Sequence, residues 1–161
     1  MFRRLLTGSI IILAALVLAR QGDGQTQESM KTRLPGPIAI TSDRLTADNK
    51  AKTAVFQGHV VAKKSDATLY ADSMTVYFGG DRDEVEKIEA AGNVRMLRKG
   101  RVIFAQAATY YNDSDKVVFT GEPRAVDGEN VVTGSEITYY VGEDRSVVEK
   151  GKVFLKDRKG E

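Results

Sequence analysis

Few side chains in this chain of 161 residues are suited to catalysis or to metal binding. It has one histidine, His59, and no cysteine, so neither a thiolate metal site nor a cysteine nucleophile can form. His59 lies in an alternating stretch on the face opposite Gly58 and Val60. We interpret it as a solvated strand residue, because there is no second histidine to complete a site for a transition metal.

Carboxylates offer two further kinds of chemistry. The densest acidic group has the oxygen ligands that calcium prefers, and it consists of Asp81, Asp83, Glu84 and Glu86. Arg82 and Lys87 interrupt this group, and its spacing is not that of a calcium-binding loop. We therefore favour a solvated hairpin loop over a calcium site.

Asp43 and Asp72 recur 29 residues apart, which suggests a carboxylate pair of the kind that glycosidases use. Gln106 and Ser135 take the equivalent place farther along the chain, so a structural role in a turn is the better interpretation. The sequence predicts no catalytic residue, no metal and no cofactor, and we expect a protein that is not an enzyme.

Basic residues form three groups, and two interpretations of them stay open. They either protect hairpin tips and the last strand against aggregation, or meet phosphates, with which arginine forms bidentate hydrogen bonds. The groups are Lys63-Lys64; Arg95 with Arg98, Lys99 and Arg101; and the tail residues Lys150, Lys152, Lys156, Arg158 and Lys159.

A repeat of about thirty residues must position these side chains. One landmark is an aliphatic residue, any residue, a small residue and a polar residue, with threonine four positions after the small one. It occurs at 40–43, 69–72, 103–106 and 132–135, at intervals of 29, 34 and 29 residues. A second landmark is a glycine, at Gly58, Gly92, Gly121 and Gly151, at intervals of 34, 29 and 30.

Each repeat predicts two strands. The glycine segments alternate apolar and other residues, as in Phe56-x-Gly58-x-Val60, which places the apolar ones on one face of a sheet. The other segments carry a phase slip, as in Leu69-x-Ala71-x-x-Met74, which predicts a bulge or corner at the same place in every repeat.

Turn residues separate these strands about every 15 residues, and links this short join antiparallel neighbours. No stretch of 12 residues after the first 19 keeps a helical apolar period. We predict an all-β domain over residues 37–156. It has roughly eight strands, or at most about eight pairs of short strands, in an antiparallel meander that curves or folds into an open sandwich.

The first 36 residues differ from this domain. Residues 1–19 have a positive start and an apolar run with small residues before a cleavage point, which predicts a signal peptide. An uncleaved anchor is the alternative, although 15 residues are short for a bilayer span. Cleavage removes Arg3 and Arg4, so 22 basic and 22 acidic residues remain, and this neutral charge does not favour nucleic-acid binding. We expect a flexible segment at 20–36 and a polar tail at 157–161.

Several of these segments resemble the organic-solvent-tolerance (OstA) domain family, in particular its members that transport lipopolysaccharide in the periplasm. The resemblance covers about 37–156, nearly all of the mature chain. Its motifs are Pro37 to Asp43, Val55 to Val60, Tyr70-Ala71-Asp72, Gly121-Glu122-Pro123 and Gly134 to Tyr140.

The resemblance implies a jelly-roll open along one seam, whose apolar interior takes the acyl chains of lipopolysaccharide. It also implies a periplasmic location and head-to-tail joining with two partners: an anchored inner-membrane subunit and an outer-membrane β-barrel translocon. The two unlike edge strands, at about 37–47 and 147–156, predict head-to-tail oligomers of the chain itself. Because each partner carries the same domain, an anchored subunit stays an alternative role. A periplasmic β-repeat scaffold or polysaccharide-binding module is a third.

From the alternation we predict that one set of side chains shares an interior that binds lipid. The set is Ile40, Phe56, Val60, Leu69, Met74, Val76, Val94, Met96, Ile103, Phe119, Val132, Ile137 and Tyr139.

Overall fold

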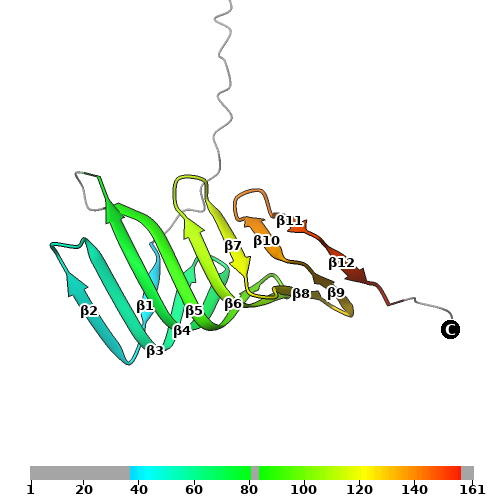
Figure 1. Ribbon diagram of the computed structural model, residues 1–161, viewed down its shortest axis with the longest axis horizontal. Helices are drawn as coiled ribbons and strands as arrows, with labels where there is room; N and C mark the ends of the chain where they lie inside the picture. Colours follow the sequence, from blue (N-terminus) through cyan, green and yellow to red (C-terminus); the bar gives the residue numbers. More distant parts are fainter. Residues whose placement is uncertain (1–36, 81–83, 157–161) are drawn as a thin grey trace, which may run out of the picture. The chain divides into compact units, whose positions relative to one another are not determined.

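The computed structural model describes residues 37–80 and 84–156, and this part of the chain is antiparallel β-sheet without a helix (Figure 1). None of its segments is a helix that could cross a membrane. The strands are β1 (Ala39–Thr41), β2 (Arg44–Asp48), β3 (Thr53–Lys64), β4 (Ala67–Gly79), β5 (Glu84–Arg98), β6 (Arg101–Tyr111), β7 (Lys116–Thr120), β8 (Arg124–Asp127), β9 (Asn130–Thr133), β10 (Glu136–Tyr140), β11 (Arg145–Glu149) and β12 (Lys152–Phe154).

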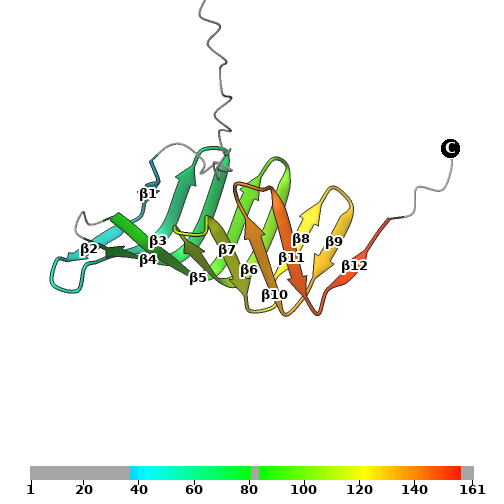
Figure 2. The same cartoon turned by 90° about the horizontal axis from the view of Figure 1, so that it is seen from above.

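These twelve strands are eight longer strands that all bend at one line across the sheet (Figures 1 and 2). Four of them, β3 to β6, run through the bend without interruption, whereas the bend divides the others into β1–β2, β7–β8, β9–β10 and β11–β12. The prediction of roughly eight strands that turn a corner is therefore confirmed. The higher strand number arises because backbone pairing stops at the bend in the outer repeats.

The bend, which we call the corner line, divides the sheet into two half-sheets. The first half-sheet has the order β1, 60–64, 67–71, 94–98, 101–105, β8, β9, β12. The second has the order β2, 53–57, 73–79, 84–91, 107–111, β7, β10, β11. Away from the corner line lie hairpin turns of both half-sheets, such as 65–66 in the first and 112–115 in the second, and we call this side of the sheet the mouth.

The corner is built in the same way in successive repeats. Gly92 and Asn93 both have positive φ, 77° and 47°, and a Cβ on Gly92 would collide with the carboxylate of Asp72 on β4. Asn93 Nδ2 donates a 2.8 Å hydrogen bond to that carboxylate. Gly58 and His59 repeat this arrangement against Asp43 with φ of 77° and 45°. Glycine is needed there because only it combines positive φ with such a close approach.

The corner also explains why only one type of strand carries a phase slip. At the corner, residues 92 and 93 of the glycine strand β5 have no register partner on β6, whereas on β6 only Gln106 has none on β5. An even insertion keeps the apolar alternation, whereas an odd insertion reverses it. The predicted bulge is therefore confirmed, although the extra residue lies in the glycine strand.

The last corner is shorter than the others. In the register, Glu149 and Lys152 take the places that Ala91 and Arg95 have in β5. Two residues separate Glu149 from Lys152, whereas three separate Ala91 from Arg95. Lys150 carries the positive φ of 49°. The expected equivalence of Gly151 with Gly58 and Gly92 is wrong, because the register places Glu149 opposite Glu136 and leaves Gly151 inside the shortened corner.

Outward-facing side chains form a second regular feature, a cross-strand alternation of aromatic and cationic residues. In the second half-sheet, Lys87 lies 4.3 Å from the ring centre of its partner Tyr77, and Arg145 lies 4.1 Å from that of Tyr140. In the first, Arg95 lies 4.6 Å from the ring centre of Tyr70. Such pairs stabilise a sheet by roughly 0.2–1 kcal/mol each. They give Arg95 a structural contact on the outer surface.

The segments predicted at 1–19, 20–36 and 157–161 lie outside the described residues, as do Asp81 and Asp83 of the acidic group. Among the described residues, no three carboxylate or histidine side chains come together as a metal site would require. Asp43 and Asp72 lie at the corner line as partners of His59 and Asn93, so their interpretation as structural residues is confirmed.

Candidate functional site

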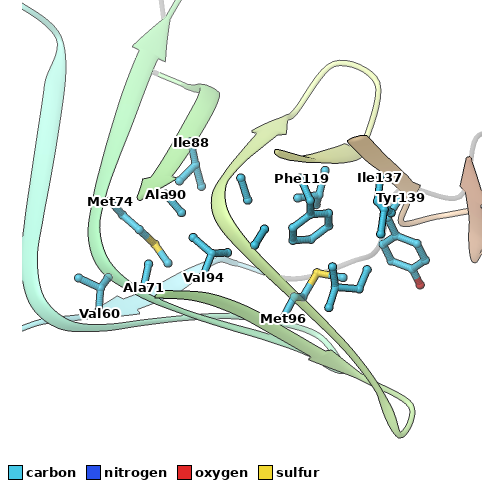
Figure 3. Close-up of a cluster of buried hydrophobic side chains, with 14 of the residues drawn as sticks. Val60, Ala71, Met74, Ile88, Ala90, Val94, Met96, Phe119, Ile137 and Tyr139 are labelled. Carbon is cyan, nitrogen blue, oxygen red and sulfur yellow. The ribbon is translucent and has the colours of Figure 1, made fainter. Parts of the chain in front are cut away.

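The two half-sheets enclose one apolar interior (Figure 3). Phe119 and Ile137 are fully buried, and Val60, Met74 and Val94 are each 1% exposed. Phe119 and Ile137 come from the second half-sheet and Val94 from the first, so the core joins both. All of the predicted interior residues except Val132 belong to this core or pack against it, with Ile40, Phe56 and Leu69 half-buried at its margin.

An apolar groove opens from this core toward the mouth. Leu69 and Met96 line it from the first half-sheet, and Met74 and Tyr139 line it from the second. Its volume is about 80 Å³. If each water-sized group needs 10–15 Å³, this is room for about five to eight such groups. A second recess beside it is lined by Val132 and Ile103, so Val132 lies next to the main groove and not in it.

A cluster of polar side chains crosses the mouth at each of two successive repeats. In the first cluster, Lys64 at the end of β3 donates through Nζ to the hydroxyl of Tyr110 on β6, at 2.6 Å. Tyr110 in turn donates to Asp115 Oδ1 at 2.9 Å, and Lys64 lies 3.3 Å from the same oxygen. The side chains of Lys64 and Asp115 are only 14% and 15% exposed. This cluster, the Lys64 clasp, ties the first half-sheet to the second.

The second cluster, the Arg98 clasp, repeats this arrangement with arginine. Arg98 at the end of β5 donates through Nη1 to the hydroxyl of Tyr139 and to the carbonyl of Val141, both at 2.7 Å, and through Nε to Asp66 at 2.8 Å. Tyr139 donates to Asp144 Oδ1 at 2.6 Å. Arg98 is 7% exposed, so it is buried with each of these hydrogen bonds satisfied.

The Arg98 clasp holds its members in fixed charge states. Burial, together with the hydrogen bond to Asp144, raises the pKa of Tyr139 to about 12. The same hydrogen bond lowers the pKa of the Asp144 carboxyl, which also lies near Lys99 and Arg101. Between these two pKa values Tyr139 stays a donor and Asp144 an acceptor, so the clasp does not change with pH in that range.

Of the clasp residues, the sequence analysis placed only Tyr139 in the predicted interior, and it did not predict that the others meet at the mouth. The signal was present in the repeat spacing. Tyr110 and Tyr139 are 29 residues apart, as are Asp115 and Asp144, and Lys64 and Arg98 are 34 apart. These are the intervals of the repeat itself. Polar residues that recur with the core period indicate a position that the fold uses more than once.

Comparisons with known proteins agree with this fold. The chain is 26% identical over 149 residues to the lipopolysaccharide export system protein LptA of Escherichia coli K12, a match that covers 88% of this chain and 76% of that protein. The same values hold for LptA of Shigella flexneri. Among solved structures it resembles LptH, the LptA-homologous periplasmic component of the lipopolysaccharide transport device of Pseudomonas aeruginosa. That match has a TM-score of 0.69 at 15% identity and covers 78% of this chain and 99% of LptH.

A family model described as the LptA/LptD N-terminal domain of lipopolysaccharide transport proteins matches residues 39–145, which span both half-sheets up to β11. The predicted family, the open antiparallel fold and the expectation of a carrier without enzymatic activity are confirmed. The chain therefore belongs to the LptA/LptD N-terminal domain family of lipopolysaccharide transport proteins.

Proposed function

We propose that this protein binds lipopolysaccharide in the periplasm and passes it between inner- and outer-membrane components, with acyl chains held between the two half-sheets. The observation that carries the proposal is an apolar groove, in a chain of this family, that is bordered at the mouth by hairpin turns and side-chain clasps. Each methylene group that enters it contributes roughly 0.8 kcal/mol. The groove of about 80 Å³ takes part of one acyl chain, so a whole lipid enters when the half-sheets separate at the mouth.

Site-specific photo-crosslinking tests the position of the lipid. A crosslinker at Leu69, in the groove, or at Ile103, in the adjoining recess, should capture lipopolysaccharide in living cells. One at Lys50, in the exposed turn between β2 and β3, should not. Immunoblotting against the glycolipid measures the capture. Equal capture at all three positions would rule out the interior as the binding site.

The edges of the sheet support head-to-tail assembly. Within the described residues, β1 and β2 pair only with β3, β12 pairs only with β9, and β11 only with β10, so each end of the sheet has unpaired backbone groups. Val153, Phe154 and Leu155 at the last edge are 55%, 51% and 74% exposed. Because the two ends differ, last-to-first joining is heterologous and produces open chains of molecules.

Deletion of residues 147–161 should leave a folded monomer that binds lipid and does not assemble. The deletion removes β12 and most of β11 and leaves the groove lining through Val141 in place. Light scattering at rising protein concentration should show growing oligomers of the full-length protein and a constant mass for the shortened one. A strictly monomeric full-length protein, or long oligomers of the shortened one, would contradict the edge assignment.

A further inference from the structure

The two clasps at the mouth are equivalent in the repeat but differ in how completely their charges are satisfied. Arg98 bonds three separate groups and is 7% exposed. Lys64 has one short hydrogen bond, to Tyr110, and a longer ion pair of 3.3 Å with Asp115. Asp115 Oδ2 is buried and has no hydrogen-bond partner among the described residues. The Arg98 clasp is thus complete, whereas the Lys64 clasp pairs a cation with a poorly satisfied carboxylate.

Lys64 also faces the groove. It follows Ala62 by two residues on β3, so both point to the inner face, and both line the groove. Across the sheet, Lys64 and Arg98 are both register partners of Ala67, whose small side chain leaves room between them. Lys64 is therefore a cation at the inner edge of an apolar binding space, where the polar end of an amphiphile must lie.

We propose that Lys64 binds a phosphate group of the transported glycolipid, and that Asp115 is the internal counter-ion that this phosphate displaces. The inference rests on the proposed function and adds the group of the lipid that the mouth recognises. A phosphate monoester carries about −1.5 to −2 charges at neutral pH and three acceptor oxygens, against the single charge of a carboxylate. It is therefore the stronger partner for Lys64. The exchange also releases the tie between Lys64 and the second half-sheet, so the same event opens the mouth for the acyl chains.

Two lipids with the same acyl chains separate this site from the groove itself. The probes are lipid A with both phosphates and the same lipid after both phosphates are removed, each displacing a fluorescent fatty acid from the full-length protein. We expect the wild-type protein to prefer the phosphorylated lipid by about tenfold, the gain from one charge-assisted contact. In Lys64→Gln the preference should fall to about one, because the phosphate loses its partner and the tie that it releases is already absent, so the dephosphorylated lipid binds at least as tightly as it binds the wild-type protein. Inorganic phosphate alone should not displace the probe.

The outer face offers a matched control. There Lys87 pairs with Glu89 at 2.8 Å and lies over Tyr77, whose hydroxyl also bonds Glu89 at 2.8 Å, so the same three kinds of side chain meet away from the groove. Lys87→Gln should keep the tenfold preference. The double variant Lys64→Gln/Asp115→Asn replaces the clasp by a neutral pair that leaves no buried charge, so it should fold and also lack the preference.

The outcomes divide the two proposals. Displacement by neither lipid in the wild-type protein would remove the proposed function. Displacement by both lipids with equal affinity, or a tenfold preference that survives in both Lys64 variants, would leave the groove and overturn the phosphate site. Displacement by inorganic phosphate alone would overturn the assignment to a lipid headgroup.

Discussion

Replacing Phe119 with alanine should lower the free energy of unfolding by about 3–5 kcal/mol, the usual cost of removing a fully buried aromatic ring. Phe119 is 0% exposed and lies in β7 between Ala108 of β6 and Ile137 of β10. The ring is the largest of the fully buried side chains in the described part of the chain, and its small neighbour Ala108 cannot fill the space. Thermal unfolding followed by circular dichroism should show a midpoint lower by about 10–20 °C.

Phe104→Ala is the control for this prediction. Phe104 lies on the outer face of β6, is 40% exposed and has Arg124 at 5.6 Å from its ring centre. Its removal deletes the same ring from a position without enclosed packing, so the loss should be about 1 kcal/mol or less. Similar losses for both variants would mean that the interior packs less tightly than the burial of Phe119 indicates.

The fold was predictable because its main constraints are local and repeat. The alternation around Phe56 and Val60 and the slip between Leu69 and Met74 both result from the number of residues that a strand uses to pass the corner line. The intervals of 29 and 34 residues show that such a corner recurs once in each repeat. Only the final repeat was aligned wrongly with the others. Its corner is one residue shorter but still contains a glycine, Gly151, so the sequence spacing matched while the strand register did not.

The interior side of the site was predictable for the same reason, and the mouth was not. Inward-facing apolar residues follow from the period of a strand. The clasps form between side chains 46 and 41 residues apart, Lys64 with Tyr110 and Arg98 with Tyr139. Such contacts depend on how far the two half-sheets fold toward each other, which alternation does not specify. The basic groups at 63–64 and 98–101 were visible in the sequence. That one member of each group, Lys64 and Arg98, points to the inner face was not.

Replacing Gly92 with alanine should cost about 1.5–3.5 kcal/mol, for two reasons that can be measured apart. An L residue at φ of 77° costs about 1–2 kcal/mol. The new Cβ also meets the carboxylate of Asp72, which must move and lose its hydrogen bond from Asn93. That hydrogen bond is exposed, so water solvates both groups after its loss and the loss costs about 0.5–1.5 kcal/mol. Chemical denaturation measures the total.

Gly100→Ala separates the two contributions. Gly100 has φ of 81° in the turn between β5 and β6, and a Cβ there meets no atom of the described residues within 4 Å. Gly100→Ala should therefore cost only the backbone part, about 1–2 kcal/mol. In a protein that already carries Asp72→Ala, the cost of Gly92→Ala should fall to that of Gly100→Ala, because no carboxylate is left to displace. If Gly92→Ala costs no more than Gly100→Ala in the wild-type background, the contact between Asp72 and Gly92 does not hold the corner. The bend would then depend on the positive φ values alone.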